Sequence, residues 1–254
     1  MKFILFYVLY VIMLSNDFMY GMCGGLIGTF ISHPFDTIKT RIQSNKSSSI
    51  RDSLKMGKLY SGIAPPMLGI MLEKSIVFGF YHKSKEYGLN TFWSGITGGF
   101  MATLIVTPVD KLKIAFQNKE KVTIPKASSL YRGFIPTVSR ETPGFGIYFS
   151  TYNYLMDAYN KEQKLYKSFC FGALSGLNAW IFIYPSDFIK TKLQSSTNTL
   201  QEVIYSIYYG VHDKTMCKGV HNFYKGFGLA ILRAMPLHGG VFLGYELSKK
   251  MLHE

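Results

Sequence analysis

Apolar stretches long enough to cross a bilayer dominate the chain, and polar segments separate them. Six such stretches are visible, at residues 17–43, 63–87, 91–117, 134–159, 166–194 and 227–250. A membrane-spanning helix needs about 20 mostly apolar residues, so each stretch predicts one transmembrane helix. Three of them carry charges in their middles, and such charges must face a polar interior or one another. The pattern predicts an all-α membrane protein with six transmembrane helices.

The polar connections are of two kinds. Long ones at 44–59, 118–130 and 195–223 follow the first, third and fifth stretches, whereas the others are short. The chain is therefore a series of units, each made of a helix, a long loop and a helix. Residues 1–16 hold a further apolar run behind Lys2, and a signal, an anchor and an extension of the first helix all stay open for it.

A short phrase recurs once in each unit. Each copy has a proline, an acid two residues later, a lysine three residues after the acid and a glutamine four residues further on, starting at Pro34, Pro108 and Pro185. Composition alone would give about 0.06 matches to its proline–acid–base core per chain, so three evenly spaced copies are an internal repeat. The sequence predicts a single domain of three tandem repeats, at 17–89, 90–164 and 165–250.

Composition narrows the class of the protein. Hydrophobic residues make up 48% and charged residues 17% of 254 positions, which suits a membrane protein with a wet interior, although a soluble helical core would also fit. The net charge of +13 suits anionic lipid or nucleic acid. No nucleic-acid-binding motif accompanies it, so we expect lipid and no nucleic acid. Without a metal cluster, a phosphate loop or a nucleophile–base pair in the sequence, we expect neither a metal site nor an enzyme.

The repeated phrase has the chemistry of a gate. A proline inside a helix kinks it, and the acid and the lysine lie on one helical face. Where three kinked helices converge, the acid of one repeat can pair with the lysine of another, and breaking such buried pairs is costly. Solvated pairs worth less than about 1 kcal/mol each are the alternative. The predicted pairs are Asp36 with Lys113, Asp110 with Lys190 and Asp187 with Lys39, braced by Gln43, Gln117 and Gln194.

A second phrase, a tyrosine and a glycine separated by one residue, precedes each even-numbered stretch. The free N–H groups at a helix N-terminus attract phosphate, and a base nearby adds to this attraction for anionic lipid. The first copy has Ser61 where the others have a base, so its site should be the poorest. The predicted lipid-binding residues are Gly62, Arg132, Gly133, Lys225 and Gly226.

Together, the two phrases in three copies resemble the mitochondrial carrier family over residues 17–250. The resemblance implies a pseudo-threefold barrel of six transmembrane helices around a central cavity. It also implies exchange or uniport of a small solute across the inner mitochondrial membrane by alternating access, with the acid–lysine pairs as the matrix gate. We expect a monomer that uses no cofactor, with cardiolipin as a structural lipid at the tyrosine–glycine phrases.

The family also has a cytoplasmic gate, an aromatic residue followed by an acid and, three residues after the acid, a base, near the ends of the even helices. In this chain the copies are uneven, because one is complete, one lacks its acid and one lacks both charges. The residues concerned are Tyr245, Glu246 and Lys249, then Tyr81, His82 and Lys85, then Tyr152, Asn153 and Met156. Only Glu246 with Lys85 is left as a strong pair, so we expect a weak gate and faster opening or leakier exchange.

Symmetry also locates candidate substrate-binding residues. Counting seven or eight residues from the glycine of each tyrosine–glycine phrase leads to Arg140, Glu141 and Arg233, and Glu73 lies one turn further on in the first repeat. Ionisable residues in mid-span are costly and usually functional. Arginine binds carboxylates and an acid can hold an ammonium, so we expect a solute with a carboxylate and extra positive charge. The alternative is that these charges only neutralise one another.

The amino-acid sequence around these positions is similar to that of the ornithine/basic amino acid and carnitine/acylcarnitine branch of the family. Trp180 also matches the basic amino acid carriers, either as core packing or as a cation–π wall. The resemblance implies a basic amino acid such as ornithine or arginine, with carnitine, acylcarnitine and S-adenosylmethionine as alternatives. A carrier-like membrane protein without transport activity is the alternative from another class.

Overall fold

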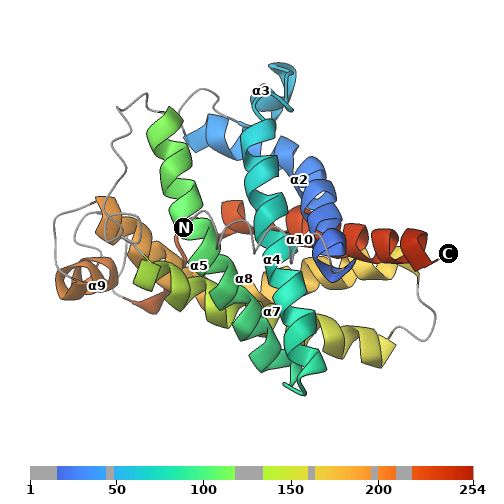
Figure 1. Cartoon of the computed structure of the whole chain (residues 1–254). Helices are drawn as coiled ribbons and strands as arrows, with labels where there is room; N and C mark the ends of the chain where they lie inside the picture. The colour runs from blue at the N-terminus through green and yellow to red at the C-terminus, as the bar shows by residue number, and fades with distance from the viewer. Residues whose placement is uncertain are drawn as a thin grey trace.

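The computed structural model describes residues 16–43, 49–117, 134–159, 164–195, 200–209 and 219–253. These ranges are helical, without strands, and they contain the six long helices that the sequence predicts. Across the same ranges, no helix is both long enough and apolar enough to cross a membrane. The long helices are α2 (Asn16–Gln43), α4 (Ala64–Glu86), α5 (Thr91–Gln117), α7 (Phe134–Tyr159), α8 (Leu165–Ser195) and α10 (Phe227–His253) (Figure 1).

The six long helices close into a ring. Each packs against the next, in the order α2, α4, α5, α7, α8 and α10, and α10 packs back against α2. The first helices of the repeats therefore alternate with the second helices around the ring, as a threefold barrel requires. Three short elements lie in segments that we expected to be polar loops: α3 (Ile50–Lys55), α9 (Leu200–Tyr209) and η1 (Val220–Tyr224). Figure 1 shows α3 and α9 at separate edges of the molecule.

Glycines bring neighbouring helices of the ring into backbone contact. A Cβ atom added at Gly24 of α2 would lie 2.6 Å from the backbone oxygen of Val241 in α10. The same addition at Gly95 of α5 would approach the backbone oxygen of Phe145 in α7 to 2.6 Å. Small residues at helix contacts allow this approach. The glycine-rich first helix of a repeat is therefore a packing surface.

The glycines of the tyrosine–glycine phrases have a conformational role. Gly62 and Gly226 adopt positive φ angles of 79° and 81° just before α4 and α10, a region that side chains disfavour. These turns lead the chain into the second helix of a repeat. Lipid binding at them stays a prediction, and Arg132 and Gly133 lie outside the described residues.

Candidate functional site: a charged cavity beside an aromatic layer

All five predicted substrate-binding residues line one cavity of about 160 Å³ between α4, α7, α8 and α10. A second cavity of about 120 Å³ lies on the α5 side and shares part of this lining, together with Thr103 and Thr107. Symmetry counting, together with the family resemblance that pointed to Trp180, therefore leads to residues that the fold gathers in one place. The five residues are Glu73, Arg140, Glu141, Trp180 and Arg233.

Both arginines of the cavity are bound to carboxylates. Arg140 donates from Nη1 to Asp187 Oδ1 at 2.6 Å, and from Nη2 to Glu141 of its own helix. Arg233 pairs through Nε with Asp36 in α2. The buried Nε of Arg140 has no hydrogen-bond partner among the described residues. This N–H group is therefore a buried donor without an acceptor in the described part of the chain.

These pairs differ from the gate that we expected from the sequence. Asp187 was expected to pair with Lys39, but no ion pair joins them in the described part of the chain, and Arg140 binds Asp187 instead. The physical reason is reach, because α7 packs against α8 and brings a long guanidinium to this carboxylate. The remaining gate positions lie where no side chain is described, so their part of the ring stays a prediction. They are Gln43, Asp110, Lys113, Gln117, Lys190 and Gln194.

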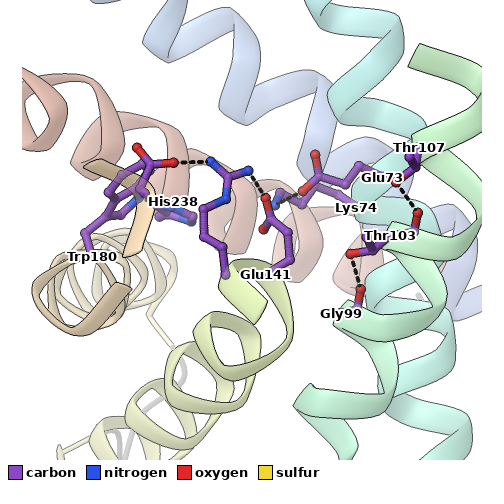
Figure 2. Close-up of polar contacts among 10 residues, drawn as sticks. Glu73, Lys74, Gly99, Thr103, Thr107, Glu141, Trp180 and His238 are labelled. Carbon is purple, nitrogen blue, oxygen red and sulfur yellow. Dashed lines mark hydrogen bonds and ion pairs between the residues drawn. The ribbon is translucent and has the colours of Figure 1, made fainter. Parts of the chain in front are cut away.

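A further ion pair in the cavity, between Lys74 and Glu73, was missed by sequence reasoning. Lys74 donates from Nζ to Glu73 Oε1 at 2.8 Å, and Figure 2 shows the two side chains together. The ammonium group also lies 4.5 Å from the centre of the Phe145 ring. The available signal was a lysine beside an acid in a mostly apolar segment, where a charge is costly.

Trp180 and His238 form the other side of the cavity (Figure 2). The indole Nε1 of Trp180 donates to His238 Nε2 at 3.3 Å, which fixes the orientation of both rings. In this arrangement the hydrogen of the neutral imidazole is on Nδ1. That buried nitrogen has no partner among the residues described. The wall of the cavity thus contains a second buried N–H group without a partner among the described residues.

Beside the cavity, six aromatic side chains of α4, α7 and α10 form an aromatic layer. At its centre are Phe78, Phe149 and Phe242, which occupy equivalent positions in the three repeats. Their ring centres are 5.1, 5.6 and 6.1 Å apart, with the edge-to-face geometry that aromatic pairs favour. Tyr148, which lines the cavity, contacts Phe149 and Phe242. The layer therefore borders the cavity directly.

Three tyrosines complete the aromatic layer, and each stacks on a phenylalanine of another helix. Because each tyrosine reaches a phenylalanine of a different repeat, the three contacts lock the even helices in a cycle. The stacked pairs are Tyr81 on Phe149, Tyr152 on Phe242 and Tyr245 on Phe78.

The tyrosine hydroxyl groups extend the same cycle with hydrogen bonds. Asn153 Nδ2 donates to the Tyr81 hydroxyl at 2.9 Å. The Tyr152 hydroxyl donates to Glu246 Oε1 at 3.3 Å. The third bond, of 2.7 Å, joins the hydroxyl of Tyr245 to His82 Nε2.

The aromatic layer includes the tyrosines of the predicted cytoplasmic gate, but it does not contain the expected ion pair. Within the described ranges, no ion pair joins Glu246 to Lys85, whose ammonium donates to Thr91 Oγ1 at 3.2 Å. Glu246 accepts from Tyr152 instead. The expectation of this pair was wrong because motif counting considered only charges. Side chains without charge, at positions 82 and 153, supply the other two bonds of the cycle.

Comparison with known proteins adds to this geometry. A family model described as mitochondrial carrier protein matches residues 12–91, 126–163 and 161–254. The mitochondrial glycine transporter YMC1 of Saccharomyces cerevisiae is 29% identical, over 93% of this chain and 91% of its own. The mitochondrial carnitine carrier of the same yeast is also 29% identical, over 93% of this chain and 87% of its own. The mitochondrial basic amino acids transporter of Homo sapiens is 28% identical, over 90% of this chain and 88% of its own.

Proposed function

Since the chain belongs to the mitochondrial carrier family, we propose that it exchanges a basic amino acid, such as ornithine or arginine, across the inner mitochondrial membrane. The observation that carries this proposal is the mixed charge of the cavity, where two arginines and two glutamates share one lining. A solute that is only an anion would leave the glutamates opposed to it. A basic amino acid carries both the carboxylate and the extra positive charge that such a lining complements.

The lining suggests how this substrate lies. Its carboxylate binds between Arg140 and Arg233, which both line the cavity. Its ammonium groups bind toward Glu73 and Glu141, which border both cavities. Trp180 offers a ring face to a positively charged group.

Transport depends on competition between the substrate carboxylate and two carboxylates of the protein for the arginines of the cavity. In the structure Arg140 and Arg233 hold Asp187 and Asp36, two acids of the predicted matrix gate. A substrate carboxylate that takes their place releases both acids toward the predicted lysines of the gate. Binding energy from the substrate thereby shifts the population of gate states, as alternating access requires.

Carnitine, acylcarnitine and S-adenosylmethionine are the second candidates. Each combines a carboxylate with a positive charge, and the relatives include a carnitine carrier. Trp180 in the lining favours a methylated cation, because aromatic faces bind groups that cannot donate hydrogen bonds. A carrier-like protein without transport activity is the alternative from another class.

Uptake into liposomes that contain the purified protein tests the proposal. The panel is ornithine, arginine, lysine, carnitine, S-adenosylmethionine, phosphate and ADP, each offered to liposomes loaded with the same solute. We expect exchange of the basic amino acids, and we expect Glu73→Gln and Arg140→Ala to abolish it. Exchange of carnitine alone would replace the substrate assignment, and no exchange of any solute would favour the non-transporting alternative.

A further inference from the structure

Lys74 is a buried cation that the proposed exchange does not use. Its side chain is 5% exposed, whereas that of its partner Glu73 is 29% exposed. No second carboxylate lies within ion-pair distance of it in the part of the chain that the structure describes. The lysine therefore depends on Glu73 for its charge partner, while Glu73 faces both cavities.

The pairing of adjacent residues on one helix is itself informative. Side chains at i and i+1 do not face each other on an α-helix, so the lysine side chain bends back to reach the carboxylate. The backbone of α4 is fixed here, because Gly21 of α2 packs against the carbonyl of Lys74. The ring of Phe145 supports the ammonium from α7. The ε-ammonium group is thus held at the acid that the proposed substrate needs.

We propose that Lys74 competes with the substrate for Glu73. By this competition it sets how strongly the carrier binds solutes that have a positively charged side chain. Its terminal ammonium is the same chemical group as the side-chain end of lysine or ornithine. In the empty carrier it neutralises Glu73, whose charge would otherwise lack a partner. A substrate ammonium must displace it, and the displaced lysine keeps the face of Phe145. The inference rests on the proposed function, since it assumes that the ammonium of a substrate reaches Glu73.

Competition by arginine and by citrulline for uptake of a labelled substrate tests the inference. The two compounds have side chains of similar length, but only arginine has a charged one. Lys74→Met removes the competing lysine. We therefore expect it to lower the inhibition constant of arginine about tenfold, a change that corresponds to one charge-assisted hydrogen bond. That of citrulline should change less than twofold, and Lys74→Arg should keep the ratio of the wild type. Equal changes for both compounds would overturn the inference and leave Lys74 a structural cation.

A second experiment does not depend on the transported solute. Lys74→Ala leaves Glu73 without its partner, so n-butylammonium chloride should raise the unfolding temperature of this variant and not that of the wild type. Sodium chloride at the same ionic strength is the control. An equal effect on both proteins would contradict the inference. If the wild type exchanges no basic amino acid but the variant is stabilised, the proposed function fails and the ammonium subsite stands.

Discussion

Arg140 is the side chain of the cavity that binds two carboxylates at once. It binds Glu141 on its own helix and Asp187 on α8, and keeps its Nε unused. A guanidinium has five N–H donors in a fixed planar fork, so it holds two carboxylates in a geometry that the ammonium of a lysine does not reproduce. The residue therefore links the proposed substrate site to an acid of the predicted gate through a single group.

Replacement of this fork by a point charge should weaken substrate binding. Arg140→Lys keeps the charge but loses at least one charge-assisted hydrogen bond, worth about 1.5–3 kcal/mol. We expect the KM for arginine exchange to rise about tenfold or more. Initial rates in liposomes measure this, with Arg51→Lys on the exposed α3 as the control that should leave KM unchanged. An unchanged KM in Arg140→Lys would mean that the guanidinium does not contact the substrate.

The sequence predicted which residues line the cavity better than it predicted which residues they bind. Ionisable residues inside apolar segments are conspicuous, and repeat symmetry assigns them to one depth, so Arg140 and Arg233 could be found. Which acid each one binds depends on distances across helices, and these are not encoded in any local pattern. Lys74 was missed because an adjacent acid and base on a helix are expected to point apart.

At the scale of helices, the glycines of α2 lie where the neighbouring helices pack against it. Gly24 faces the backbone of α10, and Gly25 that of α4, so two neighbours approach the same helix closely. A methyl group at such a position meets backbone atoms that cannot rotate away. The contact between α2 and α10 also closes the ring of helices, and it aligns Arg233 with Asp36.

Two alanine substitutions should have opposite effects. Gly24→Ala places a methyl group 2.6 Å from the Val241 oxygen, so overpacking should destabilise the protein by about 1–3 kcal/mol. Gly228→Ala in the first turn of α10 meets nothing within 4 Å, and should stabilise the helix by about 0.5–1 kcal/mol. Thermal unfolding in one detergent and lipid mixture measures both. A shift of the same sign in the two variants would contradict the packing role of Gly24.

The helices themselves were predictable because their apolar runs are long and end at polar segments. The predicted stretch 134–159 coincides with α7. The short helices α3 and α9, of six and ten residues, were missed, since both lie in segments that were interpreted as polar loops. Ser49 caps α3 by accepting from the Asp52 amide at 3.2 Å, a local signal that is weak without the surrounding fold.

At the scale of the whole molecule, the second helices of the repeats are joined by the aromatic layer. Its stacked rings and hydroxyl bonds run from α4 to α7, from α7 to α10 and from α10 to α4. The same threefold order is broken in the cavity, where the first repeat has Gly69 in the place of Arg140 and Arg233. Thus the aromatic layer is symmetric, whereas the lining of the cavity is not. An aromatic layer with few charges can therefore serve as the closing element on its side of the cavity.

If the aromatic layer must part for the cavity to open on that side, a weaker layer should expose the cavity more often. Tyr152→Phe removes the hydroxyl that donates to Glu246, and loss of a hydrogen bond to a charged group costs about 1.5–3 kcal/mol. We expect a cysteine at the lining position Ala179 to react about tenfold faster with a membrane-impermeant maleimide added on that side. The measurement uses a background in which Cys23, Cys170 and Cys217 are serine.

Tyr154→Phe is the matched control, because Tyr154 lies on the same helix and is 69% exposed. It should leave the labelling rate unchanged. Addition of the exchanged substrate should raise the rate in the wild type and reduce the difference between it and Tyr152→Phe, since substrate binding offsets part of the cost of opening. Equal labelling rates in Tyr152→Phe and the wild type would show that opening on this side does not break the bond to Glu246.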